Sequence, residues 1–150
     1  MSQYVDIFIE REGIFIPLDS YSRGSSLYIE ISEFLPYEQV RHLTGDELRS
    51  IASKISKSIE DNKKRIESCE KDKLAIGHFN NSLDEKLEAL EEINQDILEW
   101  KEIIEESKYA RSTLEVLADI ADNGNYCSPQ VRIYAGIEIS NPTKEDIVED

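Results

Sequence analysis

The fold of this chain is decided by two stretches of its sequence. Residues 44–77 read TGDELRSIASKISKSIEDNKKRIESCEKDKLAIG, and residues 82–122 read SLDEKLEALEEINQDILEWKEIIEESKYARSTLEVLADIAD. In both, mostly apolar residues recur at alternating steps of three and four, which is the heptad spacing of helices that pack side by side. The stripes consist of Leu48, Ala52, Ile55, Ile59, Asn62, Ile66, Cys69, Lys73 and Ile76, and of Leu83, Leu90, Ile93, Ile97, Trp100, Ile104, Ser107, Arg111, Leu114, Ala118 and Ala121. The pattern predicts two helices far longer than those of an ordinary globular protein.

Both stretches begin with a capping box, in which a Ser or Thr and a Glu three residues later bond each other's backbone amides. Thr44 pairs with Glu47 in this way, and Ser82 pairs with Glu85. Gly77 suits the end of the first helix. Because only a short turn separates the two helices, they are expected to run antiparallel as a helical hairpin.

Alternating apolar residues outside the hairpin predict β-strands. Residues 4–18 form a β-hairpin with its turn at 11–13, 27–33 form a third strand and 131–139 a fourth, whereas 37–43 are expected to form a helical turn. An isolated two-stranded hairpin is only marginally stable in water, so the last strand should join the first three in one sheet. We therefore expect an α+β fold: a small antiparallel-rich sheet of three N-terminal strands plus one C-terminal strand, with a long inserted helical hairpin.

This arrangement predicts a single domain over residues 1–150. Residues 1–43 and 126–139 form the β platform, 44–122 form the hairpin, and 140–150 form a frayed acidic tail. One aliphatic face of the sheet should lie against the helices; its residues are Val5, Ile7, Ile9, Ile14, Ile16, Leu18, Leu27, Ile29, Ile31, Val131 and Ile133. The middle of the hairpin carries only the narrow seam, so it is expected to project as a coiled-coil arm, which favours a homo-oligomer.

Charge is concentrated on the second helix. The chain has 32 acidic and 17 basic residues and a formal net charge of −15. Residues 82–122 carry 13 acidic and 4 basic residues, whereas residues 45–79 carry 7 and 8. An acidic strip recurs along this helix; it consists of Glu85, Glu88, Glu92, Glu99, Glu102 and Glu106. It is interpreted either as a solvated face balanced by Lys57, Lys63, Lys64 and Lys71 of the first helix, or as a docking strip for a basic protein surface.

The same charge bears on partners and location. A strongly acidic protein repels phosphate backbones and anionic lipid, so neither direct nucleic-acid binding nor membrane binding is expected. No stretch approaches the length of apolar sequence that spans a bilayer. Residues 1–30 lack a secretion signal, and Cys69 and Cys127 do not make a disulfide framework, so a cytoplasmic protein is expected.

The second candidate surface is the other face of the sheet. The alternation places an aromatic-rich group there that includes Tyr4; its proposed site residues are Phe8, Phe15, Tyr28, Arg132 and Tyr134. The face is expected to be covered in part by residues 19–26 and 34–43, to form a dimer interface, or to stack on a nucleobase-like ligand. Arg23, Gly24 and Ser25 form a candidate anion-binding loop, because amides of such loops can bind phosphate.

Signals for catalysis are absent from the sequence. His42 and His78 have no second His or Cys at ligand spacing, and neither a phosphate-binding glycine loop nor a nucleophile elbow occurs. We therefore predict no catalytic residues, no metal site and no cofactor. The predicted function is that of a non-enzymatic binding protein whose acidic arm docks on a basic protein, specifically an inhibitor of a nucleic-acid-processing enzyme that imitates nucleic acid. The alternatives are a binder of a nucleotide-like small molecule and an oligomeric assembly subunit.

Overall fold

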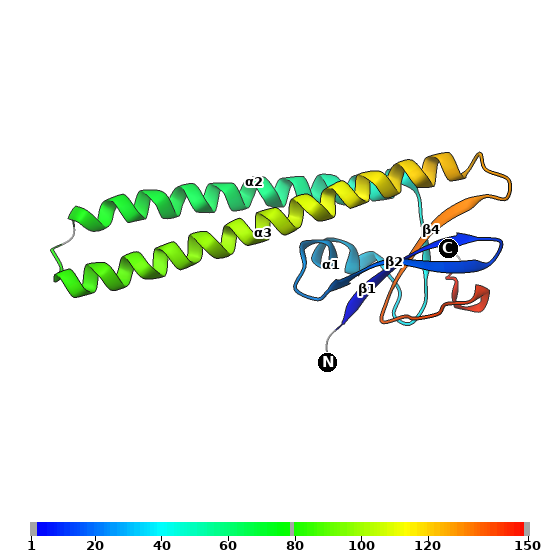
Figure 1. The fold of residues 1–150 in the computed structure, drawn as a ribbon, viewed down its shortest axis with the longest axis horizontal. Coiled ribbons are helices and arrows are strands. Elements are labelled where there is room, and N and C mark those ends of the chain that lie inside the picture. Colours follow the sequence, from blue (N-terminus) through cyan, green and yellow to red (C-terminus); the bar gives the residue numbers. More distant parts are fainter. Residues whose placement is uncertain (1–2, 79, 149–150) are drawn as a thin grey trace.

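A four-stranded antiparallel sheet and a long helical hairpin make up the fold (Figure 1). The computed structural model describes residues 3–78 and 80–148. Its elements are β1 (Tyr4–Arg11), β2 (Ile14–Ser22), α1 (Ser26–Ile31), β3 (Arg41–Leu43), α2 (Gly45–Ala75), α3 (Leu83–Gly124) and β4 (Val131–Ile137), with short 3-10 turns at Ser32–Phe34, Ile76–His78 and Lys144–Asp146.

The helical hairpin confirms the prediction from the heptad stripes. Helix α2 has 31 residues and α3 has 42. Thr44 Oγ1 accepts a hydrogen bond from the Glu47 amide at 3.2 Å, and Glu47 Oε1 accepts one from the Thr44 amide. Ser82 Oγ accepts a hydrogen bond from the Glu85 amide at 3.3 Å. Both helices therefore begin where the sequence predicts, because these caps satisfy amides that have no partner within the helix.

The sheet joins the two ends of the chain. Its strand order is β2-β1-β4-β3, so β1 lies between its hairpin partner β2 and the C-terminal strand β4. Val5 pairs with Ile137 and Arg11 with Val131, which fixes the register over the whole length of β1. A bulge interrupts the pairing of β1 with β2 between Ile7 and Phe8. The predicted membership of the C-terminal strand in the sheet is confirmed.

The predicted third strand is wrong in position. Residues 27–33 are not a strand, because Ser26–Ile31 form the short helix α1. Ser25 caps this helix by accepting a hydrogen bond from the Tyr28 amide, and Leu27, Tyr28 and Ile31 are buried at helical spacing while Ile29 is exposed. The third N-terminal strand is instead β3, which lies within the segment 37–43 predicted to be a helical turn.

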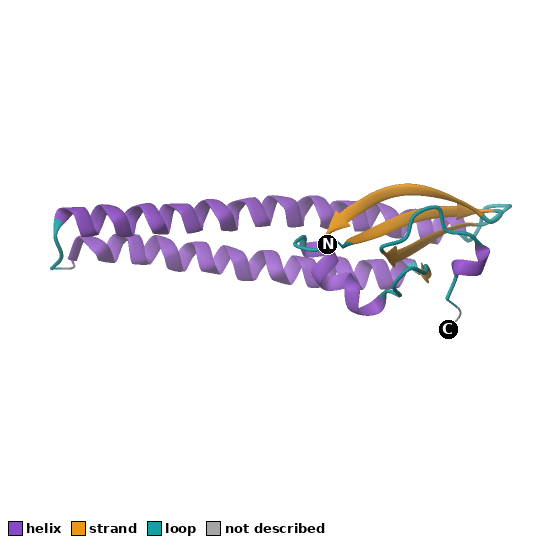
Figure 2. Cartoon of the chain, turned by 90° about the horizontal axis from the view of Figure 1, so that it is seen from below, coloured by secondary structure: helices purple, strands orange, loops and turns teal. Residues whose placement is uncertain are grey.

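The main core lies between the sheet and the base of the hairpin (Figure 2). Its side chains come from all four strands and from α1, α2 and α3; the largest fully buried ones include Ile7, Leu27, Leu48, Ile55, Leu114 and Ile133. Contrary to the prediction for the aliphatic face, Ile14, Ile16 and Leu18 of β2 are exposed. The pairing order explains this, since β2 is the edge strand and the hairpin covers its neighbours.

Beyond the sheet the hairpin projects as an arm, as its narrow seam predicts (Figure 1). Asn62 is buried on the seam, and its Oδ1 accepts a hydrogen bond from Arg65 at 3.0 Å. The guanidinium of Arg65 lies 4.8 Å from the ring centre of Trp100 on α3. Polar and aromatic contacts of this kind hold the two helices in register where few aliphatic side chains remain.

The second face of the sheet is covered: Val40 comes from the segment 34–43 that is expected to give partial cover, and Ile147 comes from the tail that is expected to be frayed. Glu138 has a positive φ of 54°, which ends β4 two residues earlier than predicted and turns the chain. The Val40 amide donates to the Asp146 carbonyl and the Val148 amide donates to the Val40 carbonyl, both at 2.9 Å. Val40, Ile139 and Ile147 then pack on Phe8 and Tyr134 in a second small core.

Truncation of a core side chain tests the sheet-on-hairpin arrangement. Leu114 of α3 is 0% exposed, so Leu114→Ala is expected to lower the free energy of unfolding by about 2 to 5 kcal/mol, because it removes buried methyl groups and leaves a cavity. The matched control is Leu74→Ala on the arm, where the side chain is 78% exposed, with an expected change within about 0.5 kcal/mol. Urea denaturation followed by circular dichroism measures both, and equal effects would contradict the assigned core.

Candidate functional site

The acidic strip runs along an exposed face of α3. All six of its residues are exposed; they are Glu85, Glu88, Glu92, Glu99, Glu102 and Glu106. Their spacing of three, four and seven residues places them on one side of the helix. At 1.5 Å per residue the strip is about 32 Å long. It begins near the tip of the arm and ends where α3 reaches the sheet.

The lysines of α2 do not neutralise the strip by direct contact. The basic residues that form ion pairs have other partners: Lys63 pairs with Glu60 of its own helix, and Arg49 bridges to Asp119 and Asp122 at the base of α3. Within residues 3–78 and 80–148, no ion pair joins Lys57, Lys63, Lys64 or Lys71 to a glutamate of the strip. The strip therefore presents its charge to solvent.

Glu106 also has an internal role in the fold, as Glu85 does at the N-cap of α3. Its Oε1 accepts a hydrogen bond from the Ser26 amide at 3.1 Å, which ties α1 to α3. The neighbouring hydroxyls of Ser26 and Ser107 lie 2.5 Å apart and are buried. This contact bears on the candidate anion-binding loop. The Ser26 amide, which directly follows Arg23, Gly24 and Ser25, already donates its hydrogen to the carboxylate of Glu106.

The candidate anion-binding loop itself is a helix cap. Arg23 and Gly24 are exposed, whereas Ser25 is buried. The Ser25 hydroxyl donates to the Ser22 carbonyl at 2.8 Å and accepts from the Tyr28 amide at 3.2 Å. The Ser/Gly sequence is therefore explained by the start of α1 rather than by an external ligand.

The five residues proposed for the aromatic face do not form one surface. Phe8, Phe15 and Tyr134 do meet, with ring centres 6.3 and 5.3 Å apart in edge-to-face contacts. Phe8 is 3% exposed and Tyr134 4%, which agrees with the expected partial cover by residues 34–43 and leaves little of these two rings free for stacking. Tyr28 lies on α1, where its hydroxyl donates to Gln3, and Arg132 is an exposed residue of β4 that donates to Gln130.

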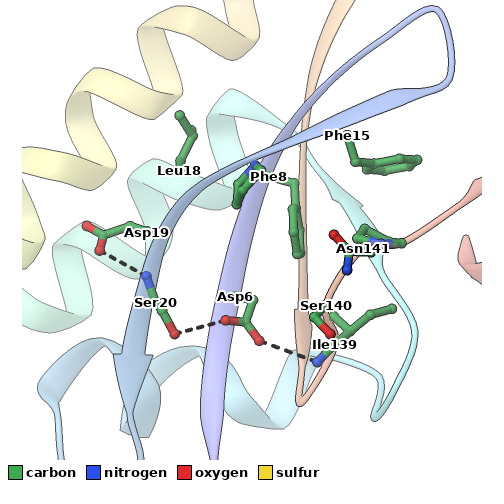
Figure 3. A pocket seen from close by; sticks show the side chains of 11 residues that line it. Asp6, Phe8, Phe15, Leu18, Asp19, Ser20, Ile139, Ser140 and Asn141 are labelled. Atoms are coloured by element: carbon green, nitrogen blue, oxygen red, sulfur yellow. Dashed lines mark hydrogen bonds between the residues drawn. The ribbon is translucent and has the colours of Figure 1, made fainter.

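A pocket of about 320 Å³ remains on this side of the sheet, between β2 and the segment that follows β4 (Figure 3). Phe8, Phe15 and Pro17 form apolar walls, and Asp6 lies at its polar end. Asp6 Oδ1 accepts a hydrogen bond from the Ser20 hydroxyl at 2.8 Å, and Oδ2 accepts one from the Ile139 amide at 3.3 Å. Both oxygens are thus engaged in joining β1, β2 and the C-terminal segment.

Burial raises the pKa of Asp6 above its ordinary value, and the hydrogen bond from Ser20 opposes that rise. The sequence does not mark this pocket, because Ile139 and Ser140 follow Asp6 by more than 130 residues and no local motif connects them. The pocket was therefore missed, and the only signal available was the alternation that puts Asp6 and Phe8 on the same side of β1.

Comparison with family models, with curated proteins and with solved structures finds no match for this chain. In the part of the chain that the structure describes, no three His, Cys, Asp or Glu side chains are grouped so that they could hold a metal ion. None of the helices over residues 3–78 and 80–148 combines the length and the apolar character needed to cross a membrane. The acidic strip is consequently the surface on which a functional argument can rest.

The pKa of Asp6 gives a test of the pocket. Because the folded state raises it, the native protein holds more protons than the unfolded chain between pH 3.8 and the raised value. The contribution of Asp6 to stability therefore falls as the pH rises through this interval and is constant above it. The unfolding free energy of Asp6→Asn minus that of wild type, measured across this range, should therefore increase with pH.

The exposed Asp61→Asn supplies the control for removing one negative charge from an acidic protein. A carboxyl titration of Asp6 by NMR that gave a pKa at or below 3.8 would contradict the burial of this group.

Proposed function

We propose that this protein is a non-enzymatic binding protein whose α3 arm docks on a basic surface of a partner protein. One observation carries the proposal: the six glutamates of the strip are exposed on one side of α3, and no ion pair to the lysines of α2 is found among the described residues. Complementary charge of this kind steers association and selects partners more than it adds affinity.

The arm is built in a way that keeps the strip available. The seam of α3 is occupied by α2, and its sheet-facing residues are occupied by the core, so a partner reaches the strip without displacing either contact. Because the arm extends beyond the sheet, the strip can enter a groove on another protein (Figure 2). A row of like charges held on a helix also costs no ordering of a loop on binding.

The specific form of the proposal is an antagonist of a nucleic-acid-processing enzyme. The strip places six negative charges over about 32 Å, which is close to the length of one turn of duplex DNA. A basic cleft that binds phosphates through Lys and Arg would meet a comparable row of carboxylates. The protein would then block the cleft without being a substrate, which needs no catalytic group of its own.

A role as an oligomeric assembly subunit is a second candidate, and the arm supplies its observation. Leu74, Leu83 and Leu87 are exposed near the tip of the hairpin, where the seam is narrow. Exposed leucines on a two-helix arm favour association with further helices. A nucleotide-like ligand has weaker support, because Phe8 and Tyr134 are buried and only the half-buried Phe15 among the three contacting rings remains partly accessible.

Partner capture with strip variants tests the proposed function. Wild-type protein immobilised on a support is expected to retain a basic partner from its native host and to release it as salt is raised. The triple variant Glu88→Gln, Glu92→Gln and Glu99→Gln should bind the purified partner at least about tenfold more weakly, since three contacts to positive charge are lost. The matched control makes the same change of charge on α2 with Glu60→Gln, Glu67→Gln and Glu70→Gln, and should bind as wild type does.

Release of the captured partner by added duplex DNA or RNA is the expected result for the antagonist form. Equal weakening by the two triple variants would mean that net charge alone controls binding, and this would refute docking through the strip. Circular dichroism confirms that each variant keeps its helices.

A further inference from the structure

A groove of about 370 Å³ lies between the edge strand β2 and α3. Leu18 and Asp19 of β2 form one side, and the other side is a row of α3 residues: Tyr109, Ser112, Thr113, Val116, Leu117 and Ile120. Its lining is mainly apolar, yet Tyr109 is 67% exposed and Val116 59%. The groove thus exposes apolar side chains at the position where a third helix would cover β2.

The sheet extends this apolar surface. Ile16 pairs with Ile9 and Ile14 with Arg11, and paired residues of antiparallel strands point to the same side of a sheet. Ile9 packs against the main core, so Ile14 and Ile16 lie on the side of the sheet that the helices cover elsewhere. Both are exposed because the helices do not cover this end of the edge strand.

The groove and the acidic strip lie on one continuous lane of α3. After Glu99, Glu102 and Glu106 the same steps of three and four residues continue through Tyr109, Thr113, Val116 and Ile120. This spacing keeps residues on one side of a helix, so the lane is acidic along the arm and apolar beside the sheet. A partner that follows the lane meets negative charge over one part of its length and an apolar groove over the other.

The outer edge of β2 is poorly suited to pairing with another strand. Pro17 has no amide hydrogen to donate, and the bulge of the β1–β2 pairing lies beside it. The Ser20 amide already donates to the Asp19 side chain at 2.9 Å. These are features that protect edge strands from strand addition, so the groove favours a helix lying across the sheet rather than an added strand.

We infer that this groove binds an amphipathic helix of a partner protein, with basic residues flanking its apolar face. The inference rests on the proposed function for the charge of the partner, and it adds the partner's secondary structure and the place where it binds. Charge complementarity selects this occupant, because Asp19 lines the groove, and the exposed Glu102 and Glu106 precede it on the lane. The net charge of −15 acts against a second copy of this chain.

Two designed peptides of about 21 residues serve as probes, each composed of Leu, Ala and Lys. In the first, leucines follow heptad spacing; in the second, the same residues are arranged so that no apolar face forms. Fluorescence anisotropy of the labelled peptides with the full-length chain is expected to show the amphipathic peptide binding at least about tenfold more tightly. The double variant Tyr109→Gln and Val116→Gln should remove this preference. The control Leu74→Gln with Leu83→Gln changes two exposed leucines of the arm and should retain it.

The outcomes separate this inference from the proposed function. One outcome would support docking through the acidic strip and refute the groove. In it, neither peptide is preferred, and the Glu88→Gln, Glu92→Gln and Glu99→Gln variant binds both peptides more weakly to the same degree. A preference that survives the Tyr109→Gln and Val116→Gln changes would also refute it. Sedimentation velocity checks the other occupant: a dimer of the wild-type chain that these two changes dissociate would assign the groove to a second copy and overturn the inference.

Discussion

The antiparallel pairing of β1 with β4 is the constraint on which the rest of the structure depends. The two strands come from opposite ends of the chain, and each of the seven residues of β4 has a partner in β1. This pairing brings the start of α2 and the end of α3 to the same small sheet. The base of the hairpin can then bury its broad apolar face on the strands, while its distal part has only the seam between the helices to stabilise it.

The division of α3 into faces follows from that arrangement. One face packs on α2 along the heptad seam, and the sheet-facing residues enter the main core. One of the exposed lanes that remain carries glutamates along the arm and apolar side chains beside β2. An exposed lane of this length offers extended contact without an enclosed cavity, which is the geometry that the proposed docking needs.

Much of the fold was predictable because its signals are local and periodic. The capping box at Thr44 and the N-cap at Ser82 mark the starts of the helices, and the period of two in 4–10 and 131–139 predicts the strands that pair. The error at residues 27–33 has a local cause too. Leu27, Ile29 and Ile31 fit an alternating strand, but the cap by Ser25 and the burial of Tyr28 belong to a helical turn. In so short a segment, periodicity alone does not distinguish a strand from a helical turn.

The candidate site divides in the same way. The acidic strip was predictable as a run of glutamates at helical spacing, since exposure follows directly from charge. The sequence could not predict whether lysines of α2 would pair with the strip, because the positions of long side chains depend on the packing of the two helices. The pocket at Asp6 depends on residues 139–142, which are more than 130 residues away in sequence, and the cover over Phe8 and Tyr134 depends on Val40 and Ile147, which come from two separate segments.

By itself, the sequence determined the long antiparallel hairpin, its caps, the membership of both chain ends in one sheet and the concentration of negative charge on α3. Tertiary structure alone decided that β2 is an uncovered edge, that the C-terminal segment covers the aromatic face, and that Glu106 binds the start of α1. The physical reason is that helical and strand periodicity act over a few residues, whereas the order of strands and the covering of a face depend on which distant segments bury the most apolar surface together.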